Sequence, residues 1–432
     1  MSETKQPRMP KVWEALIPVA AIMVFMIVGT VVWGMDPHIP LVLACVVTAF
    51  VAAACGYKWD AIITGALDSV KSAVEALLII LCVGMLIGSW VWAGTMPAMV
   101  YYGLKFISPS VFLALGLVLT AIVGLATGSS WTASGTVGVA LMGVAMGLGI
   151  SAPLAAGMII AGAYTGDKLS PLSDSTNVAA AAAGTPLYDH VGAMMTTTVP
   201  SFVISFVLYL IVGFVVIDTS GYDASLAQGI MDAIAENFYL SPWIMLPVLV
   251  VIFAAVKRIP AIPSLLLAAA VAAVIAIFAQ GASVPDVLIG LQAGFSIETG
   301  NEYADSLLNR GGLDSMLWTI SLIMFALAYG GMMEKCRFVE SLMGGIVKRV
   351  KSTASLVAAT IITGIICDVI LTDQYLAIMI PSRMFRDEFD KRDLSRSFLS
   401  RTTEAGATLW SPMIPWNGCG AYQAGTLGDH NF

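Results

Sequence analysis

The sequence predicts an all-α polytopic membrane protein built from two inverted-topology repeats with re-entrant hairpins and broken helices. Three observations predict it. The chain is 58% hydrophobic and only 11% charged, whereas soluble domains carry about 25% charged residues. Apolar stretches close to the roughly 20 residues needed to cross a hydrocarbon core recur along the chain. Finally, the two halves of the chain repeat one order of apolar helices and polar breaks.

Seven apolar stretches are candidates for membrane-spanning helices. They are 16–32, 40–57, 77–93, 199–217, 244–256, 259–279 and 316–333. A transmembrane barrel would instead need alternating segments of about ten residues, and the sequence shows none. Lys5, Arg8 and Lys11 precede the first stretch as in a signal peptide. That stretch is too long for one and lacks a small-residue cleavage site after it, so we expect a first spanning helix.

The Lys and Arg residues of the short loops predict the orientation of the chain. With the N-terminus in the cytoplasm, nearly all of them fall inside, and only Lys105 and Arg310 fall outside. The number of membrane crossings between these loops agrees with this orientation only if two segments are re-entrant hairpins. One is 111–150, with the tip ATGSSWTASGT, and the other is 353–381, with the tip CDVILTDQYL. Irregular backbone at membrane depth is tolerated where protein or water covers it.

A shift of 240 positions superimposes the two halves. The matched pairs are Gly124 with Gly364, Thr132 with Thr372, Gly166 with Gly406, and Asn177 with Asn417. We therefore expect a first repeat over 12–217, an external acidic linker over 218–240, and a second repeat over 241–432. Each copy crosses an odd number of times, so the copies insert upside down, as in many secondary transporters. The chain ends at LGDHNF, so the second repeat is expected to lack its last helix, through truncation or as a nine-crossing variant.

The most polar stretch of the chain, GDKLSPLSDSTNV, lies in the second broken helix of the first repeat. By symmetry it converges with the segments 127–136, 368–374 and 404–417. Carboxylates, hydroxyls and carbonyls without Cys or His suit Na⁺, Mg²⁺ or Ca²⁺. The candidate ligands are Asp167, Asp174, Asp373, Ser170, Ser173, Thr176, Asn177 and Thr372, with Lys168, Asp368, Glu404 and Asn417 as secondary candidates. Protons and Na⁺ would compete for the same oxygens, and competition with alternating access produces exchange.

Some of these residues have a structural alternative. Lys168 either neutralises an empty site or pairs permanently with Asp167 to brace the break. The Ser, Thr and Asn side chains of the stretch suit helix capping as well as ion binding. Glu404 has an alternative partner in Arg401, near the cytoplasmic surface.

These motifs resemble one known family. ATGSSWTASGTVGVALMG, GDKLSPLSDSTNVAAAAAGT, TDQYLAIMIPSRMF and SPMIPWNGCGAYQAGTLG are similar to the NhaC-type Na⁺/H⁺ antiporters of the ion transporter superfamily. The resemblance implies inverted repeats, and Na⁺ leaving a bacterial cell across its inner membrane as H⁺ enters. Its polar signature maps onto Asp167, Ser170, Ser173, Asp174, Thr176, Asn177, Thr372 and Asp373. Relatives continue beyond AGTLG into one more hydrophobic helix.

The leading hypothesis is therefore a secondary Na⁺/H⁺ antiporter that needs no cofactor. The alternative is a Na⁺- or H⁺-coupled exchanger of small organic acids or amino acids, because the same family includes Na⁺-lactate/malate antiporters. Lys168 is the only deep lysine, which favours a bare cation over an organic anion. An enzyme would need a nucleophile–base pair or a metal, and no histidine lies in the polar tips; a channel would lack the repeat. The expected partners are Na⁺, H⁺ and the bilayer, with no nucleic acid; a homodimer is compatible with the sequence.

Overall fold

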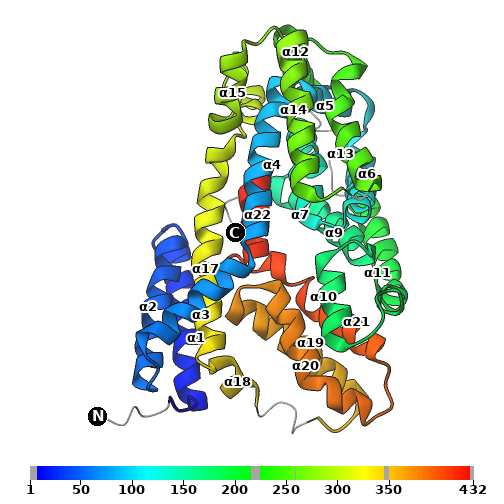
Figure 1. The fold of residues 1–432 in the computed structure, drawn as a ribbon. Helices are drawn as coiled ribbons and strands as arrows, with labels where there is room; N and C mark the ends of the chain where they lie inside the picture. The colour runs from blue at the N-terminus through cyan, green and yellow to red at the C-terminus, as the bar shows by residue number, and fades with distance from the viewer. Residues whose placement is uncertain (1–6, 216–223, 258, 345–349, 429–432) are drawn as a thin grey trace. The chain divides into compact units, whose positions relative to one another are not determined.

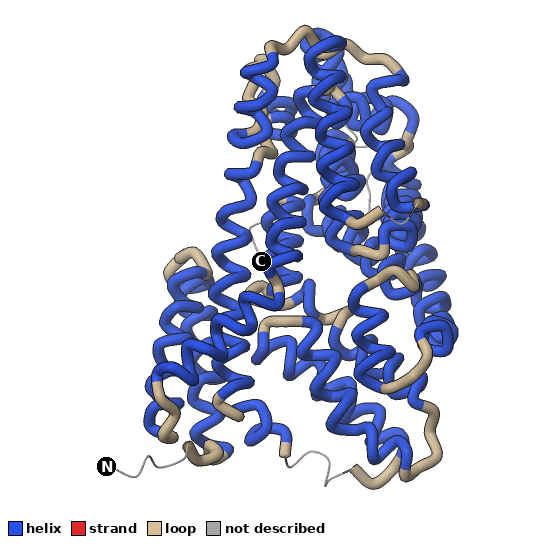
Figure 2. Tube along the Cα trace, viewed as in Figure 1, coloured by secondary structure: helices blue, strands red, loops and turns tan. Residues whose placement is uncertain are grey.

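The computed structural model describes residues 7–215, 224–257, 259–344 and 350–428. Every regular element in these ranges is a helix or a helical turn (Figure 2). Seven of the described helices are long and apolar enough to cross a membrane, and an eighth span results if one bent pair is counted as a unit. The predicted fold class, an all-α polytopic membrane protein, is confirmed.

The spans differ in two places from the seven apolar stretches. The run 40–57 forms α2 (His38–Ala54), which has 17 residues and lies at the lower limit for a crossing. The run 244–256 falls in a bent pair, Ala227–Asn237 with Pro242–Ala254, whose axes meet at 98°. The arms α6 (Pro109–Thr127) and α19 (Thr353–Leu371), which we assigned to hairpins, are each long enough to cross.

The chain divides into two compact units (Figure 1), and each contains segments from both predicted repeats. Unit 1 comprises 1–75, 175–193 and 319–422. Its helices are α1 (Val12–Met26), α2, α3 (Trp59–Ser72), α10 (Asp174–Ala183), α17 (Leu317–Lys335), α18 (Phe338–Met343), α19, α20 (Gln374–Asp390) and α21 (Arg396–Ala407). A π-helical segment, Ile27–Val32, extends α1.

Unit 2 comprises 76–174, 194–318 and 423–432. Its helices are α4 (Val74–Trp92), α5 (Thr95–Phe106), α6, α7 (Ser130–Ala133), α8 (Val139–Gly147), α9 (Ala152–Leu169), α12 (Ala224–Asn237), α13 (Leu246–Val256), α14 (Ala261–Ala279), α15 (Val284–Ala293) and α16 (Glu302–Leu308). Five helices contribute residues to both units, namely α4, α10, α11 (Leu187–Val215), α17 and α22 (Gly418–Leu427). Of the predicted linker, 218–223 lies outside the described residues, and α12 occupies most of the remainder.

Two helix crossings reproduce the glycine pairs of the predicted repeat. In unit 2, a Cβ on Gly124 would lie 2.5 Å from the carbonyl oxygen of Ala163, and one on Gly166 would overlap the carbonyl of Ala121. Helices α6 and α9 therefore touch backbone to backbone.

The same contact joins α19 and α21 in unit 1. A Cβ on Gly364 would lie 3.1 Å from the carbonyl carbon of Gly406, and one on Gly406 would lie 2.8 Å from Cα of Ile361. Only glycine permits such approach. The matched crossings support a repeat, while its inverted topology stays a prediction.

The other two matched pairs, Thr132 with Thr372 and Asn177 with Asn417, are not equivalent in the structure. Gly128 (φ 65°) caps the C-terminus of α6, and the Ser129 side chain then accepts from the N–H of Thr132. Thr372 (φ 60°) caps the C-terminus of α19, and the Asp373 side chain accepts from the N–H of Leu376. The structural counterpart of Thr372 is thus Gly128, and that of Asp373 is Ser129. Because α19 runs four residues further past its crossing glycine than α6 does, the second break lies about 6 Å further along its helix.

Candidate functional site

The stretch GDKLSPLSDSTNV forms the predicted break between α9 and α10. Helix α9 ends at Leu169, and α10 restarts at Asp174. The N–H of Ser170 donates to the carbonyl of Asp167 (2.9 Å), and the Ser170 hydroxyl accepts from the N–H of Leu172 (3.3 Å). Ser170 therefore holds the turn locally, in the capping role that its residue type suggested.

The polar side chains of the break divide by exposure. Four are buried, with relative exposures of 4% or less: Asp167, Lys168, Ser170 and Ser173. Asp174 and Asn177 are exposed at successive turns of one face of α10. Ser175 and Thr176 between them are buried. Helix α10 thus presents an acid and an amide outward and two hydroxyls inward.

The buried hydroxyls of α10 contact a carboxylate from the second half of the sequence. The Ser175 hydroxyl donates to Oε1 of Glu404 (3.1 Å), and the Thr176 hydroxyl contacts the same oxygen (3.4 Å). Glu404 lies on α21 and has no exposed surface. Both Thr176 and Glu404 were sequence candidates, and the structure of unit 1 brings them together.

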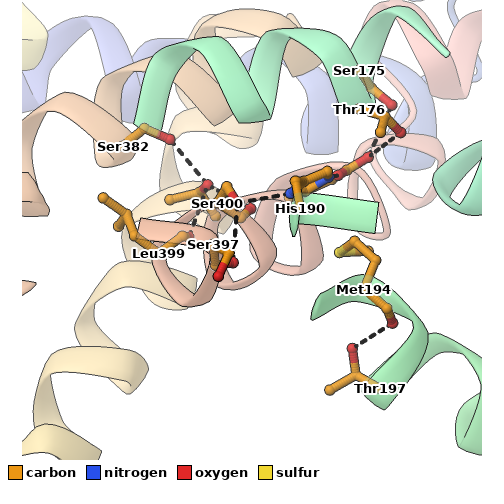
Figure 3. Close-up of polar contacts among 11 residues, drawn as sticks. Ser175, Thr176, His190, Met194, Thr197, Ser382, Ser397, Leu399 and Ser400 are labelled. Carbon is orange, nitrogen blue, oxygen red and sulfur yellow. Dashed lines mark hydrogen bonds and ion pairs between the residues drawn. The ribbon is translucent and has the colours of Figure 1, made fainter. Parts of the chain in front are cut away.

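His190 completes this cluster, as Figure 3 shows. Its Nε2 lies 2.6 Å from Oε2 of Glu404, and its Nδ1 lies 2.8 Å from the hydroxyl of Ser400. His190, Ser400 and Glu404 are all fully buried. Arg401 stays a predicted alternative partner of Glu404; the contact that joins Glu404 to α11 is the one with His190.

The hydroxyl of Ser400 lets the cluster satisfy His190 in either charge state. Ser400 lies 2.8 Å from Nδ1 of His190 and can also donate to the carbonyl of Ser397 (3.0 Å). If it donates to Nδ1, a neutral imidazole still donates from Nε2 to Glu404. If it donates to Ser397, an imidazolium donates from both nitrogens. The network therefore accommodates one proton more or less without leaving a buried polar atom unpaired.

The second hairpin places Thr372 and Asp373 at its break. Thr372 adopts a left-handed conformation that β-branched residues rarely take. Its hydroxyl donates to the carbonyl of Ala326 in α17, and its own carbonyl accepts from the N–H of Gly418 at the start of α22 (3.0 Å). Asp373 caps α20 through Leu376 (2.8 Å) and is half-buried. Both residues therefore have a structural role at the break.

Asp368 and Asn417 meet beside this break. The Asn417 amide donates to the carbonyl of Asp368 (3.2 Å) and lies 3.4 Å from its carboxylate. Both side chains are fully buried. The indole of Trp416 donates to the carbonyl of Val369 (2.9 Å), which holds the chain against the end of α19.

Sequence candidates lie in both units. Unit 1 contains the group around Glu404, with Ser175, Thr176 and His190, and the pair Asp368–Asn417. Unit 2 contains the break from Asp167 to Asp174. In the described chain, no three Asp, Glu, His or Cys residues gather as metal ligands. His190 escaped the sequence analysis because it lies at the start of α11, outside the polar tips; its position 13 residues after Asn177 carries no motif.

A polytopic helical fold with buried carboxylates at helix breaks defines a class, the secondary membrane transporters. The family model of the Na⁺/H⁺ antiporter family matches residues 162–432, more than half of the chain. The chain belongs to this family, as the motifs indicated.

The relatives that match this chain are named for more than one transport activity. The chain is 39% identical to the Na⁺/H⁺ antiporter NhaC of Bacillus subtilis, over 91% of this chain and 87% of that protein. It is 38% identical to NhaC of Alkalihalophilus pseudofirmus, over 96% and 89%. It is 33% identical to the malate-2H⁺/Na⁺-lactate antiporter of Bacillus subtilis, over 99% and 91%.

Proposed function

We propose that the protein is a secondary Na⁺/H⁺ antiporter of the bacterial inner membrane, with a cytoplasmic N-terminus, that exports Na⁺ against entering H⁺. The observation that supports it best is the buried contact between Thr176, at the restart of α10, and Glu404. Hydroxyl and carboxylate oxygens converge there from two broken segments of the chain. Such oxygens are the ligands that a dehydrated Na⁺ requires, and carboxylates also bind the competing proton.

The ion ligands we propose are the carboxylates of Asp167, Asp174 and Asp373, assisted by Ser170, Ser173, Thr176, Asn177 and Thr372. The exposure of Asp174 supports a role in which the ion reaches the site from water. The burial of Asp167 supports a role in the dehydrated site. Lys168, Asp368, Glu404 and Asn417 are secondary members, and Glu404 gains support from its hydroxyl contacts.

Proton flux in proteoliposomes tests this proposal. An internal pH dye reports the response of the purified protein to a Na⁺ pulse. We expect Asp174→Asn and Asp373→Asn each to abolish the response while the proteins remain folded by circular dichroism. Glu340→Gln is the matched control, because Glu340 is an exposed residue of α18 that pairs with Arg337 (2.6 Å) and lies in no break. Near-normal flux in either aspartate variant would remove that residue from the site.

The assay is run with and without L-lactate, L-malate and amino acids, because two of the matched relatives are named for organic substrates. A Na⁺ response without any organic solute establishes simple antiport. A response that appears only with an organic partner would replace this proposal with coupled organic-solute exchange.

A further inference from the structure

Two arginines of unit 1 that belong to no predicted ion site meet at the end of α10. Helix α10 ends at Ala183, and Gly184 follows it with a φ of 75°. A Cβ on Gly184 would lie 3.0 Å from Nη1 of Arg396 and 3.4 Å from Nη2 of Arg386. Nitrogens of two guanidinium groups, one carried by α20 and one by α21, therefore lie within 3.4 Å of a single point.

An apolar core holds the helices that carry these arginines against α10. Ala183 of α10, Phe385 of α20 and Leu399 of α21 are fully buried in one cluster (Figure 1). Arg386 follows Phe385 directly, and Arg396 lies one turn before Leu399. The convergence of the two guanidinium groups thus rests on packed helices.

The protein compensates only part of this positive charge. Nη2 of Arg386 donates to the carbonyl of Ala182, and Nε of Arg386 is buried without a hydrogen-bond partner. Among the ion pairs of the described residues, none involves Arg386. Arg396 directs Nε and Nη2 to Asp390 (3.4 and 3.2 Å), and this leaves Nη1, the atom beside Gly184, for another acceptor.

The end of α10 does not balance the remaining charge. The carbonyl end of a helix carries about half an elementary negative charge, which is less than the charge of one guanidinium. Like charges this close repel each other, and an anion between them relieves the repulsion. The arrangement therefore calls for an anion beside Gly184.

This end of α10 lies next to the membrane surface. Helix α11 begins at Leu187, three residues after Gly184, and is a membrane-spanning candidate of 29 residues. A helix of that length extends about 43 Å, which exceeds the roughly 30 Å of a hydrocarbon core. Tyr188 and Asp189 are exposed in its first turn, so the excess length lies at this end, at the level of the lipid headgroups.

We propose that Arg386 and Arg396, at the end of α10, form a binding site for the phosphate group of an anionic phospholipid. A guanidinium presents a planar fork of N–H donors that matches the oxygens of a phosphate. A phosphodiester between the two groups would neutralise the charge that the helix end and Asp390 leave uncompensated. Helix α11, which begins beside the site, is only 6% buried and offers the acyl chains of the same lipid an apolar surface.

Lipid binding to the intact protein tests the site. Native mass spectrometry of the detergent-purified protein measures the dissociation constants of phosphatidylglycerol and of phosphatidylcholine with identical acyl chains. We expect the wild type to bind phosphatidylglycerol about fivefold more tightly or better, because the choline headgroup brings a cation of its own to the two arginines. Arg386→Gln and Arg396→Gln should each weaken phosphatidylglycerol binding about fivefold and leave phosphatidylcholine binding unchanged. Arg386→Lys should lose less than Arg386→Gln, because it keeps the charge without the fork.

Lys391→Gln is the matched control, because Lys391 is an exposed cation directly after α20 that pairs with Glu388 (2.7 Å); this variant should keep the wild-type lipid preference. The site is refuted if the wild type binds the two lipids equally, or if either arginine-to-glutamine variant keeps the wild-type affinity for phosphatidylglycerol. Displacement of the lipid by an equal concentration of inorganic phosphate would overturn the assignment to a lipid in favour of a soluble phosphate. The measurement uses no ion gradient, so its outcome is independent of the proposed antiport.

Discussion

Removing His190 should show how strongly the buried cluster of unit 1 holds the fold. His190→Ala deletes the donor 2.6 Å from Glu404 and leaves the Ser400 hydroxyl without its ring partner. Removing one member of a buried ion pair costs about 3–5 kcal/mol, since the remaining charge stays buried. Glu404→Gln keeps the shape and an acceptor for Ser175, so we expect a loss of about 1–2 kcal/mol.

The double variant measures the coupling. With Glu404 already neutral, deleting His190 leaves no buried charge, so the two losses should fall short of additivity by about 2 kcal/mol. Denaturant unfolding in detergent micelles, followed by circular dichroism, supplies the four free energies of the cycle. The exposed pair Arg337–Glu340 gives the control cycle, for which we expect no resolvable coupling. Additive losses at His190 and Glu404, to within about 0.5 kcal/mol, would refute the network.

Three further predictions follow from the breaks, the crossings and the surface. Gly330→Ala should destabilise unit 1 by about 2 kcal/mol or more, because its Cβ would overlap the carbonyl of Leu371 at the hairpin break; Gly192→Ala, which meets nothing within 4 Å, should change the unfolding free energy by no more than about 1 kcal/mol. Asp373→Ser should unfold like the wild type, since Ser129 caps the first hairpin, whereas Asp373→Ala should lose about 1 kcal/mol; if Asp373 binds the ion, both lose proton flux, and flux retained by the Ser variant would make Asp373 a cap alone. The guanidinium of Arg337 lowers the pKa of Glu340, so the pair's contribution to stability is present above the ordinary Glu pKa and falls as the solution is acidified; NMR titration of the Glu340 carboxyl checks it, and an unshifted midpoint would contradict it.

The fold class could be predicted from the sequence because length and apolarity alone identify a membrane-spanning helix. The sequence also located the helix break at GDKLSPLSDSTNV. It located the two helix crossings at glycines 124, 166, 364 and 406, because close backbone contact requires a residue without a side chain. The register of the second break was missed. A constant shift of 240 assumes that the two helices end at the same distance from their crossing glycines. Helices α6 and α19 both have 19 residues, but α19 runs four residues further past Gly364 than α6 runs past Gly124. Local propensity does not expose that offset, because an apolar helix is equally favourable with its end at either position.

Contacts between distant segments were the other limit. His190 lies at the first turn of a 29-residue apolar helix. In the sequence alone, it is a single polar residue close to the expected membrane interface. Only the packing of α11 against α21 brings it to Glu404. Arg310 is predicted from the sequence to be an outer-loop charge, whereas its Nη2 would lie 3.2 Å from a Cβ on Gly428, directly after α22. Such pairings depend on tertiary geometry, which a single sequence does not encode in any local pattern.

Helix α19 runs one turn further past its crossing glycine than α6 does, and this difference affects the energetics of an alternating-access carrier. A carrier with two identical inverted halves would interconvert between inward-facing and outward-facing forms that are related by a two-fold rotation about an axis in the membrane plane and are equal in free energy. Here one hairpin turns on Gly128 and Ser129, and the other turns about 6 Å deeper along its helix on Thr372 and Asp373, with a carboxylate in place of a hydroxyl. In the inverted arrangement proposed above, exchanging the roles of the halves does not restore the starting structure. With the predicted inverted topology, the inward-facing and outward-facing forms would therefore differ in free energy, and the resting population would favour one side of the membrane before any gradient is applied.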